Sequence, residues 1–258
     1  MIDLTEEEGI FTLTMSDGEN RWNTAFVRAF SEALDEVEYS TGPASLITAS
    51  ADGKFFSNGL DLEWLQSEGE HRGGDRGVFG AEFMALMGRI ITFPIPTVAA
   101  INGHAFGAGL MVALCHDVRV MRDDRGFACA NEMQIGFKIP TPELALFRHK
   151  LPANAFFETV QLSRRWTGPQ ALAAGVVQAT AETGVFDLQA PILHHVETGP
   201  ARGRRGVVVY EAELEPHAVG ADRDRFLDDT GELLGAAEDV DHVGPLGQVG
   251  ERRVAGLA

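Results

Sequence analysis

Two glycine-containing turns and one glutamate have the residue types best suited to chemistry. The first turn, Asn58-Gly59, follows a short apolar stretch, and the second, Gly107-Ala108-Gly109, precedes a helical pattern. The first backbone N–H groups of a helix have no partner inside it, so they can bind an oxygen atom that carries negative charge. Glycine also lets a ligand approach the main chain closely. For the first turn, an ordinary strand-to-helix connection is the alternative interpretation.

Glu132 is the candidate acid–base residue, because it lies between apolar segments of the chain. Burial among apolar side chains disfavours the charged form of a carboxyl, which raises its pKa and makes it a better base near neutral pH. The alternative is a glutamate on a solvated loop. Composition alone leaves both interpretations open.

The cysteines and their histidine neighbour indicate structure rather than chemistry. Cys115 and Cys129 lie in apolar surroundings, which suits buried thiols in a reducing compartment better than a disulfide. His116 is a lone neighbour of Cys115, and we interpret it as structural. The Cys and His spacings that mark zinc sites are missing, so the sequence predicts no metal site.

Charge and hydropathy exclude several classes of partner. The 258 residues carry a formal net charge of −17 at pH 7, so neither nucleic acid nor an anionic membrane is an expected partner. A small polyanion is compatible with this charge, because backbone amides and a few local cations can hold it. The acidic N-terminus lacks the apolar segment of a signal peptide, and no apolar run approaches the roughly 20 residues that span a bilayer. We therefore expect a cytoplasmic protein.

Hydrophobic periodicity predicts an α/β protein with a largely parallel sheet. Residues 9–15 alternate as in a strand, a helix follows with Asn23 or Thr24 as its N-cap, and a second strand covers 44–49. This order implies a right-handed crossover between parallel strands. The Phe- and Met-rich face of a helix at 79–91 indicates core packing, with the lining of an apolar pocket as the alternative. Further segments are strands at 97–101, 117–121 and 176–179 and helices at 143–150, 153–162, 169–175 and 187–196.

Two polar regions differ from the rest of the chain. Residues 67–76 are rich in glycine and predict a mobile surface loop. After Thr198 basic residues interrupt an otherwise acidic chain, and helical spacing fades after about Leu234. We therefore predict a core domain at residues 1–197 and an atypical C-terminal segment at 198–258, partly helical or disordered. A divergent tail and a shifted reading frame in the gene are both consistent with this change.

Three segments in order resemble the crotonase family, the enoyl-CoA hydratase and isomerase superfamily. They are Phe55-Phe-Ser-Asn-Gly-Leu-Asp-Leu62, Ile101-Asn-Gly-His-Ala-Phe-Gly-Ala-Gly109 and the region around Glu132, within a likeness that covers roughly residues 9–195. Each motif is weak alone, whereas three at the family's spacing are specific.

The resemblance implies a fold, a substrate and a set of site residues. The fold is a crotonase-like α/β spiral of repeated strand–strand–helix (ββα) units with surrounding helices, usually assembled as homotrimers or as hexamers of two trimers. The substrate is an acyl-CoA thioester, so CoA arrives with the substrate and no cofactor is needed. The thioester oxygen would bind the backbone N–H groups of Leu60 and Ala108, the oxyanion hole. The expected substrate contacts around them are Ser57, Asn58, Gly59, Asp61, Gly107, Gly109 and Met111.

The number of carboxylates in the site distinguishes a hydratase from an isomerase. The resemblance implies that hydratases of the family use two glutamates. The matching positions in this chain are Met111 for the first glutamate and Glu132 for the second. Methionine cannot hold or activate water. A lone carboxylate suits the removal of a proton from C2 of a 3-enoyl-CoA and its return to C4, and the segment 131–136 is similar to the Δ3,Δ2-enoyl-CoA isomerase branch. The alternatives are a hydratase or thioester hydrolase that recruits water through Asp61, Glu143 or Glu158, and a catalytically silent acyl-CoA-binding protein.

Ala108 departs from the family pattern, in which glycine is usual at this position. Alanine is tolerable there if its φ is negative, or if Gly107 and Gly109 absorb the turn.

Overall fold

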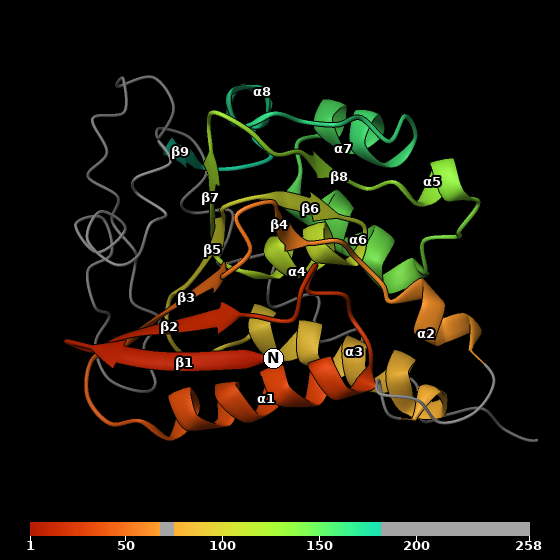
Figure 1. Cartoon of the computed structure of the whole chain (residues 1–258). Helices are drawn as coiled ribbons and strands as arrows, with labels where there is room; N and C mark the ends of the chain where they lie inside the picture. Colours follow the sequence, from red (N-terminus) through yellow and green to blue (C-terminus); the bar gives the residue numbers. More distant parts are fainter. Residues whose placement is uncertain (68–74, 182–258) are drawn as a thin grey trace, which may run out of the picture. The chain divides into compact units, whose positions relative to one another are not determined.

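The structure, a computed structural model, describes residues 1–67 and 75–181. Its larger sheet has six strands, of which the first two are antiparallel and all other neighbours are parallel (Figure 1). In spatial order the strands are β1 (Ile2–Glu7), β2 (Ile10–Met15), β3 (Ser45–Ser50), β5 (Thr97–Ile101), β7 (Val118–Arg122) and β9 (Ala179–Ala181).

A smaller sheet carries the candidate site. Its three parallel strands are β4 (Phe55–Ser57), β6 (His104–Phe106) and β8 (Ala128–Cys129), and each directly follows a strand of the larger sheet along the chain. A helical segment follows each of these strand pairs, which confirms the predicted spiral of ββα units. Because carboxyl ends of parallel strands meet at one edge, the turns after β4, β6 and β8 gather there. Leu60 lies on the first of these turns, and Ala108 and Glu132 are the first residues of the helices that follow the other two.

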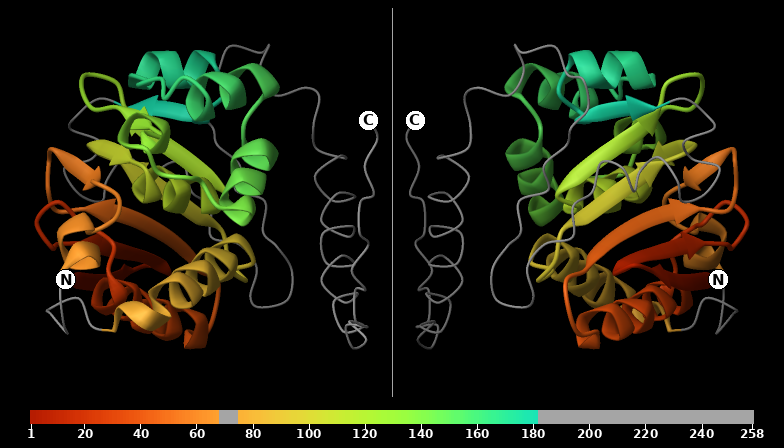
Figure 2. Two further views of the ribbon diagram at one scale, coloured as in Figure 1. Left: turned by 90° about the vertical axis from the view of Figure 1, so that its right-hand side faces the viewer. Right: turned by 90° about the vertical axis from the view of Figure 1, so that its left-hand side faces the viewer.

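Helices cover the sheets and supply most of the core. They are α1 (Thr24–Tyr39), α2 (Leu62–Gln66), α3 (Arg76–Ile91), α4 (Ala108–Cys115), α5 (Glu132–Ile135), α6 (Thr141–Lys150), α7 (Ala153–Val160) and α8 (Gly168–Ala173). Helices α1 and α3 run side by side (Figure 2). The predicted N-cap of α1 is confirmed, because Oδ1 of Asn23 accepts a hydrogen bond from the N–H of Phe26 at 2.9 Å. Core packing of the Phe- and Met-rich face of α3 is also confirmed, since Phe79, Phe83 and Met87 are buried.

Helix α4 is buried along its whole length. All its residues are buried, and it contacts strands β4 and β6 of the smaller sheet as well as β5 and β7 of the larger one. A helix that is apolar on every side is stable only inside a core. The position of its first residue, Ala108, is therefore fixed by packing on all sides.

Two parts of the sheet differ from the sequence-based prediction. Strand β1 was not predicted, because its acidic residues show little apolar alternation; as an edge strand it packs through Ile2 and Leu4 alone. The strand expected at 176–179 is placed wrongly, since β9 begins at Ala179. Val176 and Val177 are buried, but from the bend that follows α8, so their apolar character comes from core packing rather than from a strand.

Several predictions fall outside the described residues. They are the helix at 187–196, the domain boundary after residue 197, the character of the segment 198–258, and nearly all of the loop at 67–76.

Candidate active site

Leu60 lies on the turn after β4, where a bridge to Trp22 sets the direction of its N–H. The N–H of Trp22 donates to the carbonyl oxygen of Gly59 at 2.8 Å, and the N–H of Asp61 donates to the carbonyl oxygen of Trp22 at 3.0 Å. In extended backbone the polar groups of successive residues alternate in direction. The N–H of Leu60 therefore points away from Trp22, and it is available to a ligand.

Ala108 begins α4, and the turn before it is made by Gly107. Gly107 has φ +50° and ψ −120°, and its N–H donates to the carbonyl oxygen of Cys129 at 2.9 Å. Ala108 is not among the described non-glycine residues with positive φ. The expectation that Gly107 absorbs the turn is confirmed, and the N–H of Ala108, as the first of a helix, needs no intrahelical acceptor.

Glycines hold these two turns against each other. A methyl group on Gly59, which has φ +80°, would lie 2.9 Å from the carbonyl oxygen of Phe106 and 3.6 Å from the backbone nitrogen of Ala108. A methyl group on Gly109 would lie 2.6 Å from the carbonyl oxygen of Ser57. Side chains at either glycine would push the turns apart. The two N–H groups predicted for the oxyanion hole thus belong to turns in direct contact.

Glu132 brings a carboxyl group to the same place. It is the first residue of α5, and its Oε1 would lie 2.9 Å from a methyl group on Gly107, the residue before Ala108. Its Oε2 is buried and has no hydrogen-bond partner in the described part of the chain. Burial raises the pKa of this carboxyl above its ordinary value, and the hydrogen bond from its own backbone N–H opposes that shift. The predicted raised pKa is confirmed, and the solvated-loop alternative is wrong.

Ser57 is buried, and its hydroxyl supports the turn that carries Leu60. The hydroxyl donates to the carbonyl oxygen of Asn20 at 2.7 Å. Asn20 has φ +50°, and its side-chain amide donates to Oγ of Ser50 at 2.7 Å and to the carbonyl oxygen of Phe56 at 3.1 Å. Asn20 therefore fixes the segment that bridges to Leu60. The sequence analysis did not assign this supporting role to Asn20, because a polar residue at the end of a turn is a weak signal.

Asn58 and Asp61 use their side chains within the protein. The amide of Asn58 donates to Oε2 of Glu19 at 2.7 Å. Asp61 is the N-cap of α2: its Oδ1 accepts from the N–H of Trp64 at 3.0 Å, and its Oδ2 accepts from the Asn23 amide at 3.2 Å. Both side chains therefore hold the shape of the first turn. Their direct contact with a substrate stays a prediction.

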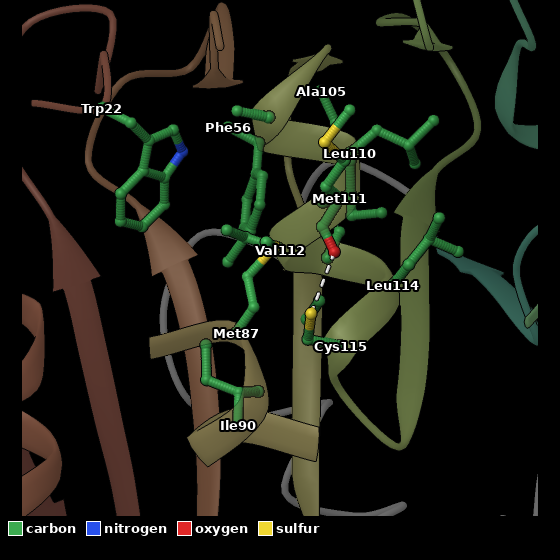
Figure 3. Close-up of a cluster of buried hydrophobic side chains, with 14 of the residues drawn as sticks. Trp22, Phe56, Met87, Ile90, Ala105, Leu110, Met111, Val112, Leu114 and Cys115 are labelled. Carbon is green, nitrogen blue, oxygen red and sulfur yellow. Dashed lines mark hydrogen bonds between the residues drawn. The ribbon is translucent and has the colours of Figure 1, made fainter. Parts of the chain in front are cut away.

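Met111 lies inside the core rather than on a surface. It is 4% exposed and packs in the buried cluster that includes Phe56 and Met87, and its carbonyl oxygen accepts from Sγ of Cys115 (Figure 3). No water-binding group stands at this position of α4, as the sequence predicts.

Of the three alternative carboxylates, only Glu143 is buried. Asp61 serves as a helix cap, and Glu158 forms an ion pair with Arg164. Glu143 is 8% exposed, and the Oε2 of its carboxyl has no hydrogen-bond partner among the described residues. Burial, followed by the nearby negative charge of Glu132, raises the pKa of Glu143.

The interpretation of His116 and the cysteines as structural is confirmed. His116 is fully buried, with Nδ1 2.9 Å from the carbonyl oxygen of Val112 and Nε2 2.9 Å from Oγ1 of Thr48. Both cysteines are free and buried, and burial raises the pKa of Cys115 to about 12 and that of Cys129 to about 11. Within residues 1–67 and 75–181 no cluster of three potential metal ligands occurs, and no helix is long and apolar enough to cross a membrane.

The geometry agrees with comparisons against known proteins. The family model for enoyl-CoA hydratase/isomerase matches residues 5–192. The chain belongs to this family. Its crotonase fold is also shared by solved structures, among them an enoyl-CoA hydratase from Mycobacterium ulcerans Agy99, with TM-score 0.62 and 27% identity over 72% of this chain and 79% of that one. An enoyl-CoA isomerase from Mycobacterium tuberculosis has TM-score 0.60 and 27% identity over 72% and 79%.

Curated relatives place the chain on the isomerase branch of the enoyl-CoA hydratase/isomerase family. The peroxisomal enoyl-CoA delta isomerase 2 of Arabidopsis thaliana is 34% identical over 185 residues, which are 70% of this chain and 77% of the relative. The chain is therefore assigned as an isomerase-like enzyme of the crotonase superfamily. The family match ends at residue 192, close to residue 195, where the likeness predicted from the sequence ends.

Proposed function

We propose that the chain is a Δ3,Δ2-enoyl-CoA isomerase that moves a double bond from C3 to C2 of an acyl-CoA. The observation that carries this proposal is the placement of the Glu132 carboxyl against Gly107, next to the turn that holds the Ala108 N–H. A base and a pair of oxyanion donors at one edge of the smaller sheet are what proton abstraction beside a thioester carbonyl requires.

The reaction divides between these groups. The thioester oxygen accepts hydrogen bonds from the N–H groups of Leu60 and Ala108, which stabilise the negative charge that develops when C2 loses a proton. Removing one such donor typically costs about 2.7 to 4 kcal/mol of transition-state stabilisation. Glu132 takes the C2 proton and delivers it to C4, while the double bond moves from C3 to C2. The thioester itself spreads the charge, so the proposal needs no metal or redox cofactor.

Hydration of a 2-enoyl-CoA is the second candidate function. Met111, at 4% exposure in an apolar cluster, does not favour it, since nothing at that position can orient water. The buried Glu143 favours it, because a second carboxylate near Glu132 is the group that a hydratase needs. A silent acyl-CoA-binding protein is disfavoured by Oε2 of Glu132, which is buried and has no hydrogen-bond partner among the described residues, because a binding role does not need such an atom.

Purified protein offered 3-hexenoyl-CoA and crotonyl-CoA tests this proposal. We expect isomerisation of the first to exceed hydration of the second, and Glu132→Gln to lower kcat by about 10² to 10⁴. Glu158→Gln is the matched control, because it removes a carboxylate that pairs with Arg164 instead. Rapid hydration without isomerisation would favour the hydratase, and binding without turnover would favour the silent protein.

Three further expectations belong to this proposal. The family resemblance favours a homotrimer or a hexamer, which sedimentation of the full chain would measure. A cytoplasmic location stays a prediction, since some isomerase relatives are named peroxisomal. The substrate contacts of Ser57, Asn58 and Asp61 stay predictions as well.

A further inference from the structure

The turn that presents the N–H of Leu60 is held along one side by residues 19–23. Two backbone hydrogen bonds of Trp22 flank Leu60. Earlier in the same turn, the N–H of Asn58 donates to the carbonyl oxygen of Glu19 at 2.9 Å. The direction of the Leu60 N–H therefore depends on how firmly residues 19–23 hold this turn.

Glu19 also binds the side chain of Asn58. Its Oε2 accepts a hydrogen bond from the Asn58 amide at 2.7 Å, and the same oxygen accepts from Nε and Nη2 of Arg21 at 2.8 Å and 2.6 Å. Hydrogen bonds to a charged acceptor are stronger than those between neutral groups. Glu19 thus holds Asn58 through both its main chain and its side chain, and Arg21 holds the carboxyl of Glu19 in place.

The carboxyl of Glu19 is charged whenever the candidate base is charged. The hydrogen bonds from Asn58 and then from Arg21 lower the pKa of Glu19, the positive charges of Arg21 and Lys54 add to this shift, and burial opposes it. The pKa of Glu132 is shifted in the opposite direction. A charged acceptor for the Asn58 amide is therefore present at every pH at which Glu132 is ionised.

The contact between Glu19 and Arg21 contributes little to folding. Their side chains are 38% and 36% exposed, and ion pairs between exposed groups add little stability. Catalysis is more sensitive, because a hydrogen bond weakens steeply when the donor turns away from its acceptor. A misplacement of about 1 Å in an active site can lower a rate by about 10²-fold. Glu19 therefore matters more for the alignment of the Leu60 N–H than for the fold.

We propose that Glu19 is a positioning residue of the oxyanion hole, which holds Asn58 and through it the turn that directs the N–H of Leu60. Glu19 acts through the main chain between Asn58 and Leu60 and does not touch the substrate. This inference rests on the proposed isomerisation, in which the Leu60 N–H binds the thioester oxygen.

Kinetics of Glu19 variants with 3-hexenoyl-CoA test this role. Glu19→Ala should lower kcat and kcat/KM together by about tenfold, with KM nearly unchanged, because an oxyanion donor acts mainly in the transition state. Glu19→Gln keeps an oxygen that can accept from the Asn58 amide, so it should recover most of this loss. A wild-type kcat in Glu19→Ala, or an equal loss in both variants, would overturn the proposal.

Glu82→Ala is the matched control for these variants. Glu82 also accepts two hydrogen bonds from one arginine, Arg28, at 2.8 Å and 2.7 Å, but it lies on α3 away from the turn of Leu60. Its loss removes an ion pair of the same kind and should leave kcat at the wild-type value.

A double-mutant cycle separates the contact with Asn58 from other effects of Glu19. Glu19→Ala and Asn58→Ala should each lower kcat, and the double variant should be no slower than the slower of the two single variants. Losses that multiply in the double variant would overturn the proposal, since the two residues would then act independently.

Amide hydrogen exchange tests the positioning without turnover. In ¹⁵N-labelled protein, the N–H groups of Trp22 and Asp61, whose hydrogen bonds flank Leu60, should exchange several-fold faster in Glu19→Ala than in the wild type and in Glu82→Ala. Unchanged exchange would overturn the proposal, whether or not the protein isomerises its substrate. Faster exchange in a protein that does not isomerise 3-hexenoyl-CoA would support the positioning role and contradict the proposed function alone.

Discussion

At the scale of single residues, the same burial that makes Glu132 a base makes it unfavourable for folding. Its Oε2 and that of Glu143 lie away from water with no partner in the described structure, and both carboxyls have raised pKa values. An unsatisfied buried polar group typically destabilises the folded state by about 1 to 3 kcal/mol. The candidate active site therefore lowers the stability of the folded protein.

This loss should depend on pH in a defined direction. A carboxyl with a raised pKa in the folded state keeps its proton there after the unfolded chain has released it, so stability falls as pH rises from about 4.3, the ordinary glutamate value. In urea unfolding at pH 8, Glu132→Gln and Glu143→Gln should each have a free energy of unfolding that is about 1 kcal/mol or more above that of the wild type. Near pH 4 the free energies of unfolding should be nearly equal. A variant that is less stable than the wild type at pH 8 would contradict this account.

At the scale of elements, the site depends on how α4 packs against β4. Small residues at the start of the helix let its first turn touch the neighbouring strand, and the burial of α4 on every side fixes that contact. The glycines therefore position the oxyanion donors rather than provide mobility.

Gly109→Ala should show this dependence. The added methyl group would lie 2.6 Å from the carbonyl oxygen of Ser57, a backbone atom that cannot turn aside. We expect a loss of about 1 to 3 kcal/mol in stability from overpacking. A fall in kcat/KM of at least about tenfold should accompany it, because one of the two donors is displaced.

Gly88→Ala in α3 is the matched control for this substitution. It is also a helical glycine, but no atom lies within 4 Å of its new methyl group. It should stabilise the protein by about 0.5 to 1 kcal/mol and leave kcat/KM unchanged. A Gly109→Ala enzyme with wild-type kcat/KM would show that the donors do not depend on this contact.

The sequence predicted the features that have a local signal, and it missed those that depend on how the elements pack. The residues of both turns and the parallel order of the main strands could be predicted from the sequence, and the structure confirms them. The raised pKa of Glu132 was one of two open interpretations, because composition does not show whether the side chain is buried. The three strands of the smaller sheet span two or three residues each, too few for a periodic signal. The burial of Glu143 depends on the packing of α6 against α4 and α7, which no spacing along the chain encodes.

At the scale of the whole molecule, one buried histidine joins the larger sheet to the central helix. His116 follows α4 and contacts Thr48 of β3 through Nε2, while Nδ1–H donates to the carbonyl oxygen of Val112. Burial lowers its pKa to about 4, and the nearby Arg119 and Lys150 also disfavour the charged form. Its effect on folding therefore opposes that of the two glutamates.

The contribution of His116 to stability should accordingly be lost as the pH falls from about 6.5 to about 4. As pH falls below about 6.5, the unfolded chain protonates His116 while the folded chain does not, which removes about 3 kcal/mol by pH 4. His116→Gln should be less stable than the wild type at pH 7, because it disrupts this buried contact. The difference should shrink steadily toward pH 4 in urea unfolding curves. A constant difference between His116→Gln and the wild type from pH 7 to pH 4 would mean that His116 titrates alike in the folded and unfolded states, which would contradict this account.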